Sequence, residues 1–400
     1  MSRWEMVIGL EVHVQLLTRT KLFCNCSTDF GAPPNANTCP VCLALPGALP
    51  VLNGEAVRLA ARAAFALGCE VHAESVFARK NYFYPDLPKG YQISQFTRPL
   101  ATNGRVALRD DAGAPAVRIH RIHMEEDAGK SIHDRFPGAT AIDLNRSGTP
   151  LIEIVSEPDL RSSTDTGTYL KRLKQILEYI EVSDANMEEG SLRVDANVSI
   201  RERGASALGT KTEIKNMNSF SGVERALEVE FARQVAILES GGSVQQQTML
   251  FDLNRNETRP ARSKEESHDY RYFPEPDLPP LRLSAEWLDS IRRDLPELPA
   301  SRRARFVREL GLPAYDAEVL TAERRVADYF EGVVASHNDP KAVANRVMGE
   351  VMARLNEAGV GIGECRVTPG QLGALPAARA RRCCEQLGGA DDLSSDVREW

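Results

Sequence analysis

The sequence predicts an α+β protein in which a largely antiparallel sheet is followed by a wholly helical region. Three observations favour this fold class. Several segments alternate apolar and polar residues with the period of two that strands have, and helical stripes of apolar residues lie between these segments. After the proline-rich segment PEPDLPP, residues 274–280, the pattern becomes wholly helical. We therefore place a boundary near residues 290–295, with a sheet domain over 1–293 and a helical domain over 294–400.

Three helices are predicted within the sheet domain. The first spans residues 55–67, where Asn53 is placed to cap the N-terminus and Gly68 ends the helix. The other two span about 165–181 and 222–239, and each has a stripe of buried aliphatic positions. We expect these helices to cover one face of the sheet.

Two segments predict strands with one apolar and one polar face. In GLEVHVQL, residues 9–16, Glu11, His13 and Gln15 alternate with aliphatic residues. In SLRVDANVSI, residues 191–200, polar and aliphatic residues alternate in the same way. A single strand of this kind is most often the solvated face of a sheet, so other strands must decide whether this face carries a function.

Acidic residues in neighbouring segments favour a functional face. Glu125 and Glu126 lie in HMEEDAGK, Glu213 shares a strand face with Lys211 and Lys215, and Glu153 lies between two isoleucines. A carboxylate inside an apolar run is costly unless it is paired or bound to a metal, so Glu153 needs a partner. Carboxylates with an occasional imidazole suit Mg²⁺, and same-face residues two positions apart lie roughly 6 to 7 Å apart. The pattern indicates a magnesium site of the kind used in nucleotide chemistry, with a solvated acidic face as the alternative.

Four cysteines predict a structural zinc site. They follow the spacing C-x-C, then twelve residues, then C-x-x-C, and they are Cys24, Cys26, Cys39 and Cys42. The loop over 24–42 is too polar to pack by itself, and in a reducing compartment disulfides are the weaker alternative. The other four cysteines, Cys69, Cys365, Cys383 and Cys384, have no ligand spacing.

Composition and motifs argue against several functional classes. A net charge of −7 does not suit nonspecific coating of nucleic acid. There is no apolar run of the length that a membrane span needs, and the N-terminus has a strand pattern in place of a signal peptide, so we expect a cytosolic protein without a membrane segment. AGKS, residues 128–131, does not complete a phosphate-binding loop because Met124 replaces its first glycine. No amidase nucleophile stands in a recognisable setting, so any ammonia used must come from another chain.

Several motifs together resemble one protein family. The motifs, in chain order, are VIGLEVHVQL, CPVC, RKNYFYPDLPKGYQISQF, HMEEDAGKS, DLNRSGTPLIEIVSEPD, MEEGSLRVDANVSI, KNMNSF and DYRYFPEPDLPP, and the match as a whole runs from residue 4 to about 375. They resemble the B subunit of the aspartyl/glutamyl-tRNA amidotransferases. The resemblance implies a cradle domain similar to the glutamine synthetase catalytic fold, then a helical domain and a small tail domain.

The reaction implied by the resemblance is phosphorylation by ATP of the side-chain carboxylate of Glu-tRNA(Gln) or Asp-tRNA(Asn). Attack by ammonia then gives Gln-tRNA(Gln) or Asn-tRNA(Asn). The ammonia comes from a partner amidase, which is the A subunit of such an enzyme, and a small third protein, the C subunit, completes a heterotrimer. The sequence does not choose between the two aminoacyl-tRNAs.

The resemblance also assigns roles to residues of this chain. The implied catalytic and Mg²⁺-binding residues are Glu11, His13, Glu125, Glu126, Glu153 and Glu213. The implied contacts to phosphate or acyl phosphate are Lys80, Lys89, Lys130 and Arg193. Three tyrosines are candidates for stacking on adenine or on the terminal tRNA base, with simple packing as the alternative: Tyr82, Tyr84 and Tyr91. The implied cofactors are ATP, Mg²⁺ and a structural Zn²⁺.

One segment departs from the family pattern, and two other functions stay open. After about Ala377 the sequence no longer follows the family's helices, so we expect a tail domain that is absent, truncated, divergent or read in another frame, and a weakened hold on tRNA. A stand-alone ATP-dependent ligase acting on a small carboxylate would keep the acidic face. A non-catalytic zinc-containing RNA-binding module would keep only the cysteines.

Overall fold

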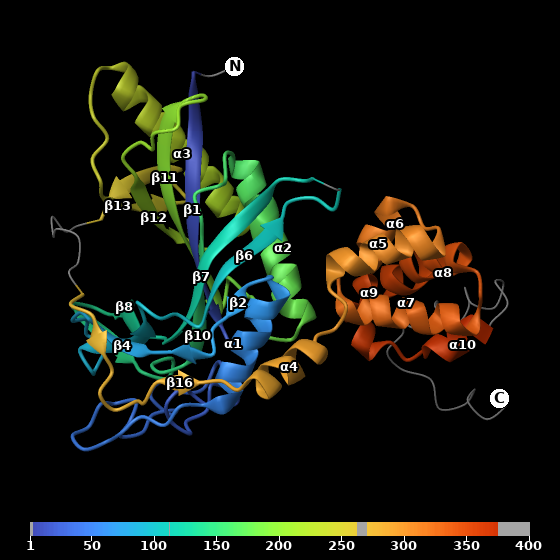
Figure 1. Cartoon of the computed structure of the whole chain (residues 1–400), viewed down its shortest axis with the longest axis horizontal. Coiled ribbons are helices and arrows are strands. Elements are labelled where there is room, and N and C mark those ends of the chain that lie inside the picture. Colours follow the sequence, from blue (N-terminus) through green and yellow to red (C-terminus); the bar gives the residue numbers. More distant parts are fainter. Residues whose placement is uncertain (1–2, 112, 262–269, 375–400) are drawn as a thin grey trace. The chain divides into compact units, whose positions relative to one another are not determined.

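The structure is a computed structural model that describes residues 3–111, 113–261 and 270–374. It contains two compact units, Met1–Pro296 and Glu297–Trp400 (Figure 1). The first combines a large sheet with helices, and the described part of the second is helical. The predicted α+β class, with a mainly antiparallel sheet before a helical region, is confirmed. The predicted change of pattern after Ala377, together with Cys383 and Cys384, lies outside the described residues.

Nine strands form the main sheet in the order β14-β13-β12-β11-β1-β10-β7-β6-β2. Neighbouring strands run antiparallel, except that β12 and β13 are parallel. The strands are β1 (Trp4–Gln15), β2 (Glu70–Val71), β6 (Ala101–Ala107), β7 (Ala116–Glu126), β10 (Pro150–Ser156), β11 (Leu192–Glu202), β12 (Thr212–Met217), β13 (Thr248–Asp252) and β14 (Glu257–Pro260). Strand β1 lies between β10 and β11, so side chains on its polar face have neighbours on both sides.

Three small sheets accompany the main one. They pair β3 (Glu74–Ser75) with β16 (Leu281–Arg282), β4 (Phe77–Asn81) with both β5 (Tyr91–Gln95) and β15 (Phe273–Pro274), and β8 (Lys130–Phe136) with β9 (Ala139–Asp143). The pairing of β4 with β15 joins two segments that are far apart in the sequence.

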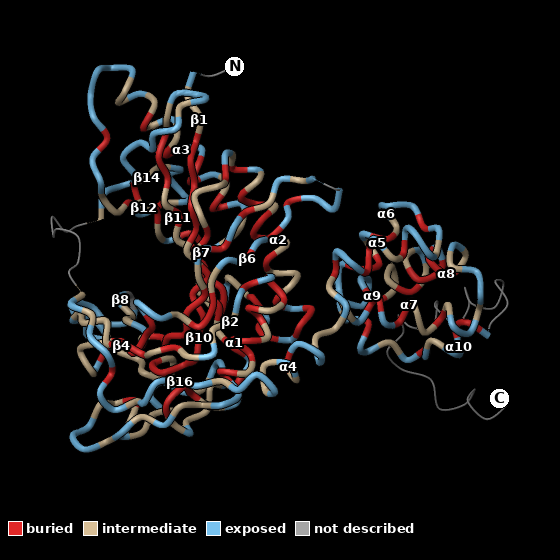
Figure 2. The backbone as a smooth tube through the Cα atoms, in the orientation of Figure 1, coloured by how far each residue is buried: buried red, intermediate tan, exposed pale blue. Residues whose placement is uncertain are grey.

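The aliphatic face of β1 forms part of the core of the first unit. Leu10, Val12 and Val14 are fully buried, and Figure 2 shows the buried backbone concentrated along the central strands. Helices α1 (Gly54–Ala66), α2 (Ser163–Tyr179) and α3 (Phe220–Glu239) pack against strands of the sheet, and α4 (Ala285–Arg293) packs on α1. The predicted capping of α1 is confirmed, because the Asn53 side chain accepts hydrogen bonds from the amides of the first helical turn. The burial of one face leaves the polar face of β1 for the functional groups.

The described part of the second unit consists of helices around its own core. They are α5 (Pro299–Leu310), α6 (Ala314–Leu320), α7 (Arg324–Ser336), α8 (Pro340–Arg346), the π-helix η1 (Val347–Met352), α9 (Ala353–Ala358), the 3₁₀-helix η2 (Ile362–Glu364) and α10 (Pro369–Ala374). Phe306 and Phe330 are fully buried in this core, with ring centroids 5.1 Å apart. Within the part of the chain that the structure describes, no helix has both the length and the apolar character required to cross a membrane.

Candidate metal centres and active site

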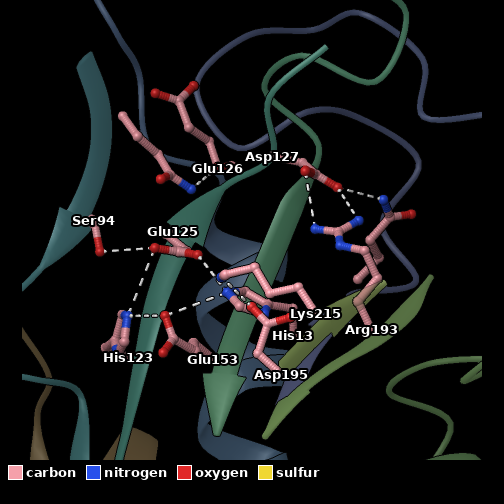
Figure 3. A network of polar contacts seen from close by, with 12 residues as sticks. His13, Ser94, His123, Glu125, Glu126, Asp127, Glu153, Arg193, Asp195 and Lys215 are labelled. Atoms are coloured by element: carbon pink, nitrogen blue, oxygen red, sulfur yellow. Dashed lines mark hydrogen bonds and ion pairs between the residues drawn. The ribbon is translucent and has the colours of Figure 1, made fainter. Parts of the chain in front are cut away.

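The register of the central strands places four polar residues in one row across the sheet. His13 on β1 lies opposite Glu153 on β10 and opposite Arg193 on β11. Glu153 in turn lies opposite His123 on β7. Since directly paired residues of an antiparallel sheet point to the same face, all four side chains share the polar face (Figure 3).

A first cluster of possible metal ligands consists of His13, Glu125 and Glu153. The Nε2 atom of His13 lies 3.5 Å from a carboxylate oxygen of each glutamate. His123 lies on the far side, with its Nε2 atom 3.0 Å from Glu153 Oε2. The prediction that Glu153 needs a partner is therefore confirmed by two imidazoles.

In the first cluster, opposite charges stabilise the charged forms of His13, Glu125 and Glu153 although all three are largely buried. Burial opposes protonation of His13, but hydrogen bonds to Glu125 and Glu153 raise its pKa to about 10. Burial also disfavours the charged Glu153, yet His123 and His13 hold the pKa of that carboxyl well below its usual range. The pKa of Glu125 is lowered in the same way, with Lys80 as the main charge that overcomes burial. The two glutamates are thus carboxylates, the form that binds cations.

A second cluster consists of Glu11, Asp195 and Glu213 from β1, β11 and β12. The register pairs Glu11 with Asp195, and one ligand atom from each of the three residues lies within 4.8 Å of the others. Lys215 Nζ lies 2.7 Å from Asp195 Oδ2 and 3.0 Å from Glu213 Oε1. Burial and the nearby carboxylates of Glu153 and Glu213 raise the pKa of Glu11. A cation placed here would relieve that repulsion.

The donor atoms of both clusters fit divalent cations. The first offers two carboxylates and one imidazole, and the second offers three carboxylates. Mg²⁺ prefers carboxylate oxygens, with water completing its coordination. Beside the clusters lies a pocket of about 220 Å³, lined by His13, Lys80, Tyr82, Gln92, Glu125, Asp127, Ala128, Arg193 and Asp195. Metal ligands and cations therefore face one pocket.

The structure brings five of the six predicted metal ligands to this face and places the sixth elsewhere. Glu126 follows Glu125 directly on β7, and successive strand residues point to opposite faces. Its carboxylate accepts a hydrogen bond of 3.0 Å from the amide of Ile93 and forms an ion pair with Lys89. In Figure 3 its carboxylate points away from that of Glu125. The geometry therefore places Glu126 apart from the other five predicted ligands.

The predicted phosphate-binding cations also divide into two groups. Lys80 and Arg193 line the polar pocket, and Arg193 donates hydrogen bonds of 2.8 and 3.0 Å to the two carboxylate oxygens of Asp127. Burial lowers the pKa of Lys80, but the carboxylates of the first cluster raise it above its usual range. Lys130 is exposed on β8, and Lys89 is paired with Glu126. Neither lysine is among the residues that line this pocket.

The tyrosine candidates lie in three different settings. Tyr82 lines the polar pocket, and its hydroxyl donates a hydrogen bond of 3.2 Å to Gln92. The ring of Tyr91 lies under the Arg79 guanidinium at 4.1 Å, as expected for a packing role. Tyr84 is 63% exposed, and its ring lies 6.2 Å from that of Tyr82. Tyr84 is thus accessible to a binding partner, whereas Tyr91 is half-buried against Arg79.

The four cysteines of the loop converge as a zinc site requires. One sulfur from each of Cys24, Cys26, Cys39 and Cys42 lies within 4.8 Å of the others, and the sulfurs of Cys39 and Cys42 are 3.9 Å apart. Tetrahedral Zn–S bonds of about 2.3 Å separate the sulfurs by about 3.8 Å. The amide of Cys39 donates a 3.1 Å hydrogen bond to the Cys42 sulfur. A hydrogen bond from Cys24 lowers the pKa of the Cys42 thiol to about 4, so this donor set favours a thiolate. The residues present fit a structural Zn²⁺.

A buried lysine that the sequence analysis missed lies beside this cysteine cluster. Lys21 is fully buried, and its ammonium donates hydrogen bonds to the carbonyls of Asn37 and Leu144 at 2.7 and 3.3 Å. Its charge contributes to the lowered pKa of Cys42, and both residues line a cavity of about 210 Å³. Because a buried ammonium needs a compensating charge, we interpret Lys21 as the cation facing the thiolates.

Comparison with known proteins decides the family. Residues 6–289 match the family described as "GatB/GatE catalytic domain", and residues 328–378 match the one described as "GatB domain". The chain belongs to the GatB/GatE family. The resemblance identified from the motifs is thereby confirmed.

Several proteins with known names are similar to this member of the GatB/GatE family over most of its length. The B subunit of the aspartyl/glutamyl-tRNA(Asn/Gln) amidotransferase of Syntrophotalea carbinolica is 57% identical over 375 residues, which cover 94% of this chain and 78% of the relative. The corresponding protein of Chlorobium phaeobacteroides is 57% identical over 372 residues, covering 93% and 78%. That of Myxococcus xanthus is 53% identical over 397 residues, covering 99% and 83%. The last match therefore includes most of the segment after Ala377.

The GatB/GatE family site contains residues that sequence reasoning did not assign. Asp195 completes the second cluster, His123 contacts Glu153, and Asp127 holds Arg193. For Asp195 a signal existed, because the alternation in SLRVDANVSI puts it on the polar face. His123 and Asp127 each lie two positions from Glu125, so the same alternation places them near it. Their contacts with Glu153 and Arg193 depend on the strand register, which a single sequence does not contain.

Proposed function

We propose that this chain is the component of a tRNA-dependent amidotransferase that activates the side-chain carboxylate of Glu-tRNA(Gln) or Asp-tRNA(Asn) with ATP and amidates it with ammonia. One observation carries the proposal within this family. Two clusters of metal ligands lie on neighbouring rows of one polar face, and Lys80 and Arg193 line the adjoining pocket. Such a combination suits transfer of a phosphoryl group to a carboxylate.

The chemistry explains why metal ligands and cations are needed together. A carboxylate has no useful leaving group, and conversion to an acyl phosphate provides one. Bound Mg²⁺, held by His13, Glu125 and Glu153 at one site and by Glu11, Asp195 and Glu213 at the other, would neutralise charge on the phosphate oxygens. Lys80 is placed to attract an anion in the pocket, and Asp127 fixes the guanidinium of Arg193 so that it can orient the acceptor carboxylate.

A second cavity supports the choice of ATP as the phosphoryl donor. This cavity, of about 260 Å³, adjoins Glu11 on the same polar face. Its walls include Val7, Val155, Pro158 and Leu208, with Lys211 at the edge. A partly apolar cavity with a cation, beside a cluster of possible metal ligands, suits a nucleoside with its phosphates directed toward Glu11.

The remaining parts of the proposal concern partners and scaffold. The ammonia comes from a partner amidase, the A subunit, and the small C subunit completes the heterotrimer, because the sequence of this chain offers no amidase nucleophile in a recognisable setting. We propose that the cradle resembles the glutamine synthetase catalytic fold and that the four cysteines hold a structural Zn²⁺. A protein that acts on aminoacyl-tRNA works where translation takes place, so a cytoplasmic location belongs to the same proposal.

The test uses the chain reconstituted with its two partner proteins. We expect ATP hydrolysis and amide formation with mischarged Glu-tRNA(Gln) or Asp-tRNA(Asn), and neither with free glutamate. Amidation of free glutamate by the isolated chain would favour the stand-alone ligase. Binding of RNA without ATP hydrolysis for any acceptor would favour the non-catalytic zinc-containing module.

A further inference from the structure

Five aromatic rings form a continuous row that passes the polar pocket at Tyr82. Tyr82 lines that pocket, and its ring centroid lies 6.2 Å from Tyr84 and 6.0 Å from Tyr270. Tyr270 lies 5.9 Å from Tyr272, whose ring stacks on Phe96 at 4.1 Å and an interplanar angle of 3°. We call these five residues the aromatic row.

Both ends of the aromatic row are open to solvent. Phe96 is 42% exposed and Tyr84 is 63% exposed. The neighbour of Tyr84, Phe83, is 88% exposed, and its ring lies so close to Gly90 that a Cβ there would come within 2.9 Å of the ring. Large aromatic side chains are usually buried in a core, so this exposed aromatic area is available to a binding partner.

The backbone under the aromatic row is fixed by hydrogen bonds. Asn81 Nδ2 donates to the carbonyls of Tyr270 and Arg271 at 3.1 and 2.9 Å. Arg271 has φ 43°, in the left-handed region that an arginine rarely adopts. Next to it, β15 pairs with β4, and Arg79 Nε donates a 2.7 Å hydrogen bond to Glu275. Because strain of this kind persists only where the surroundings enforce it, the backbone that carries Tyr270 and Tyr272 is held in one conformation.

A cation lies between the aromatic row and the pocket. The ammonium of Lys80 is 5.1 Å from the centroid of the Tyr270 ring, and Lys80 also lines the pocket. Aromatic faces combined with a cation are the usual means by which proteins bind unpaired nucleotides. A row of rings beside the pocket also suits an unpaired nucleic-acid strand whose end must reach that pocket.

We propose that the aromatic row binds the unpaired 3′-terminal nucleotides of the aminoacyl-tRNA by base stacking. The inference rests on the proposed function, because the amino acid is esterified to the 3′-terminal ribose. When the side-chain carboxylate occupies the pocket, the terminal base must lie near it, where Tyr82 lines the pocket and Tyr270 and Tyr272 continue the row. Stacking accepts any base face, so the row supplies affinity and position, and the pocket supplies the chemistry.

The experiment uses the reconstituted heterotrimer and a tRNA whose 3′-terminal adenine is replaced by the fluorescent base 2-aminopurine. Stacking quenches this fluorescence, so we expect quenching on binding to the wild-type complex. Tyr272→Ala and Phe96→Ala should each restore the fluorescence and raise KM for aminoacyl-tRNA about tenfold. Tyr272→Phe keeps the ring and should keep the quenching. Phe30→Ala removes a ring that is 75% exposed outside the row and should behave as wild type.

Several outcomes would overturn the inference. Full quenching and an unchanged KM in both alanine variants would show that the row does not bind the terminal bases. Alternatively, the alanine variants could lose the amidase partner while the complex that still assembles quenches the fluorescence as wild type does. That result would mean that the row is a protein interface. Failure of the wild-type complex to amidate any aminoacyl-tRNA would contradict the proposed function itself. Normal amidation, with quenching that is the same in the wild type and the alanine variants, would contradict only this inference.

Discussion

His13 lies directly opposite Glu153 in the antiparallel register of β1 and β10, with His13 Nε2 and Glu153 Oε2 3.5 Å apart. Two residues that are 140 positions apart in the chain thereby join the first cluster of possible metal ligands on the polar face. The same strand carries Glu11 two positions earlier, in the second cluster. Strand β1 thus contributes one ligand to each cluster, and substitutions on it test the site most directly.

Substitution of either ligand on β1 should abolish activation of the substrate carboxylate. We expect Glu11→Gln and His13→Ala to lower amidation of mischarged tRNA by more than about a hundredfold, because phosphoryl transfer depends on positioning and charge neutralisation. Glutamine hydrolysis by the partner amidase, measured as glutamate release, should persist.

Val12, between these ligands on the buried face, provides the matched control. Val12→Ala should lower the free energy of unfolding by about 1 to 3 kcal/mol and leave the activity per folded molecule near that of wild type. Wild-type amidation by Glu11→Gln and His13→Ala would mean that the polar face is only a solvated surface.

The pKa of His13 predicts how the stability of the Mg²⁺-free protein depends on pH. The pKa is raised from 6.5 to about 10 in the folded state, so protonated His13 stabilises the fold fully below about pH 6.5. That contribution is lost as the pH rises through 10. The difference in unfolding free energy between wild type and His13→Gln, measured by denaturant titration, should therefore be larger at pH 6 than at pH 10. A difference that is constant with pH would contradict this assignment.

Much of the fold follows from local patterns, whereas the site depends on pairing between distant segments. The alternation in GLEVHVQL and SLRVDANVSI predicted β1 and β11, and caps predicted α1, because these signals lie within a few residues. Grouping Glu126 with Glu125 ignored the same alternation, which places neighbours on opposite faces. The contacts of His123 with Glu153 and of Tyr272 with Phe96 join residues 30 and 176 positions apart, and no local pattern encodes them.

The cysteine cluster predicts about one zinc per chain. Cys39→Ser should lose the metal and lower the thermal unfolding midpoint, because a site closed by four protein ligands contributes to folding. Elemental analysis of freshly reduced protein measures the metal content. Cys69→Ser, which alters a buried cysteine outside the cluster, should retain the zinc, and wild-type protein prepared without chelator that contains no zinc would contradict the assignment.

Lys21 gives a second, independent test of the zinc site, because its buried charge contributes to the lowered pKa of the Cys42 thiol. A zinc ion with four thiolates carries two net negative charges, and a fixed ammonium nearby favours that state over the metal-free thiols. Lys21→Met keeps the length of the side chain and removes its charge, so zinc affinity should fall by about 10- to 100-fold in competition with a chromogenic chelator. Lys171→Met removes an exposed lysine on α2 and should leave zinc affinity unchanged. If Lys21→Met competes for zinc as strongly as wild type, the lysine serves only to tie the carbonyls of Asn37 and Leu144 together, and the charge of the thiolate cluster is balanced elsewhere.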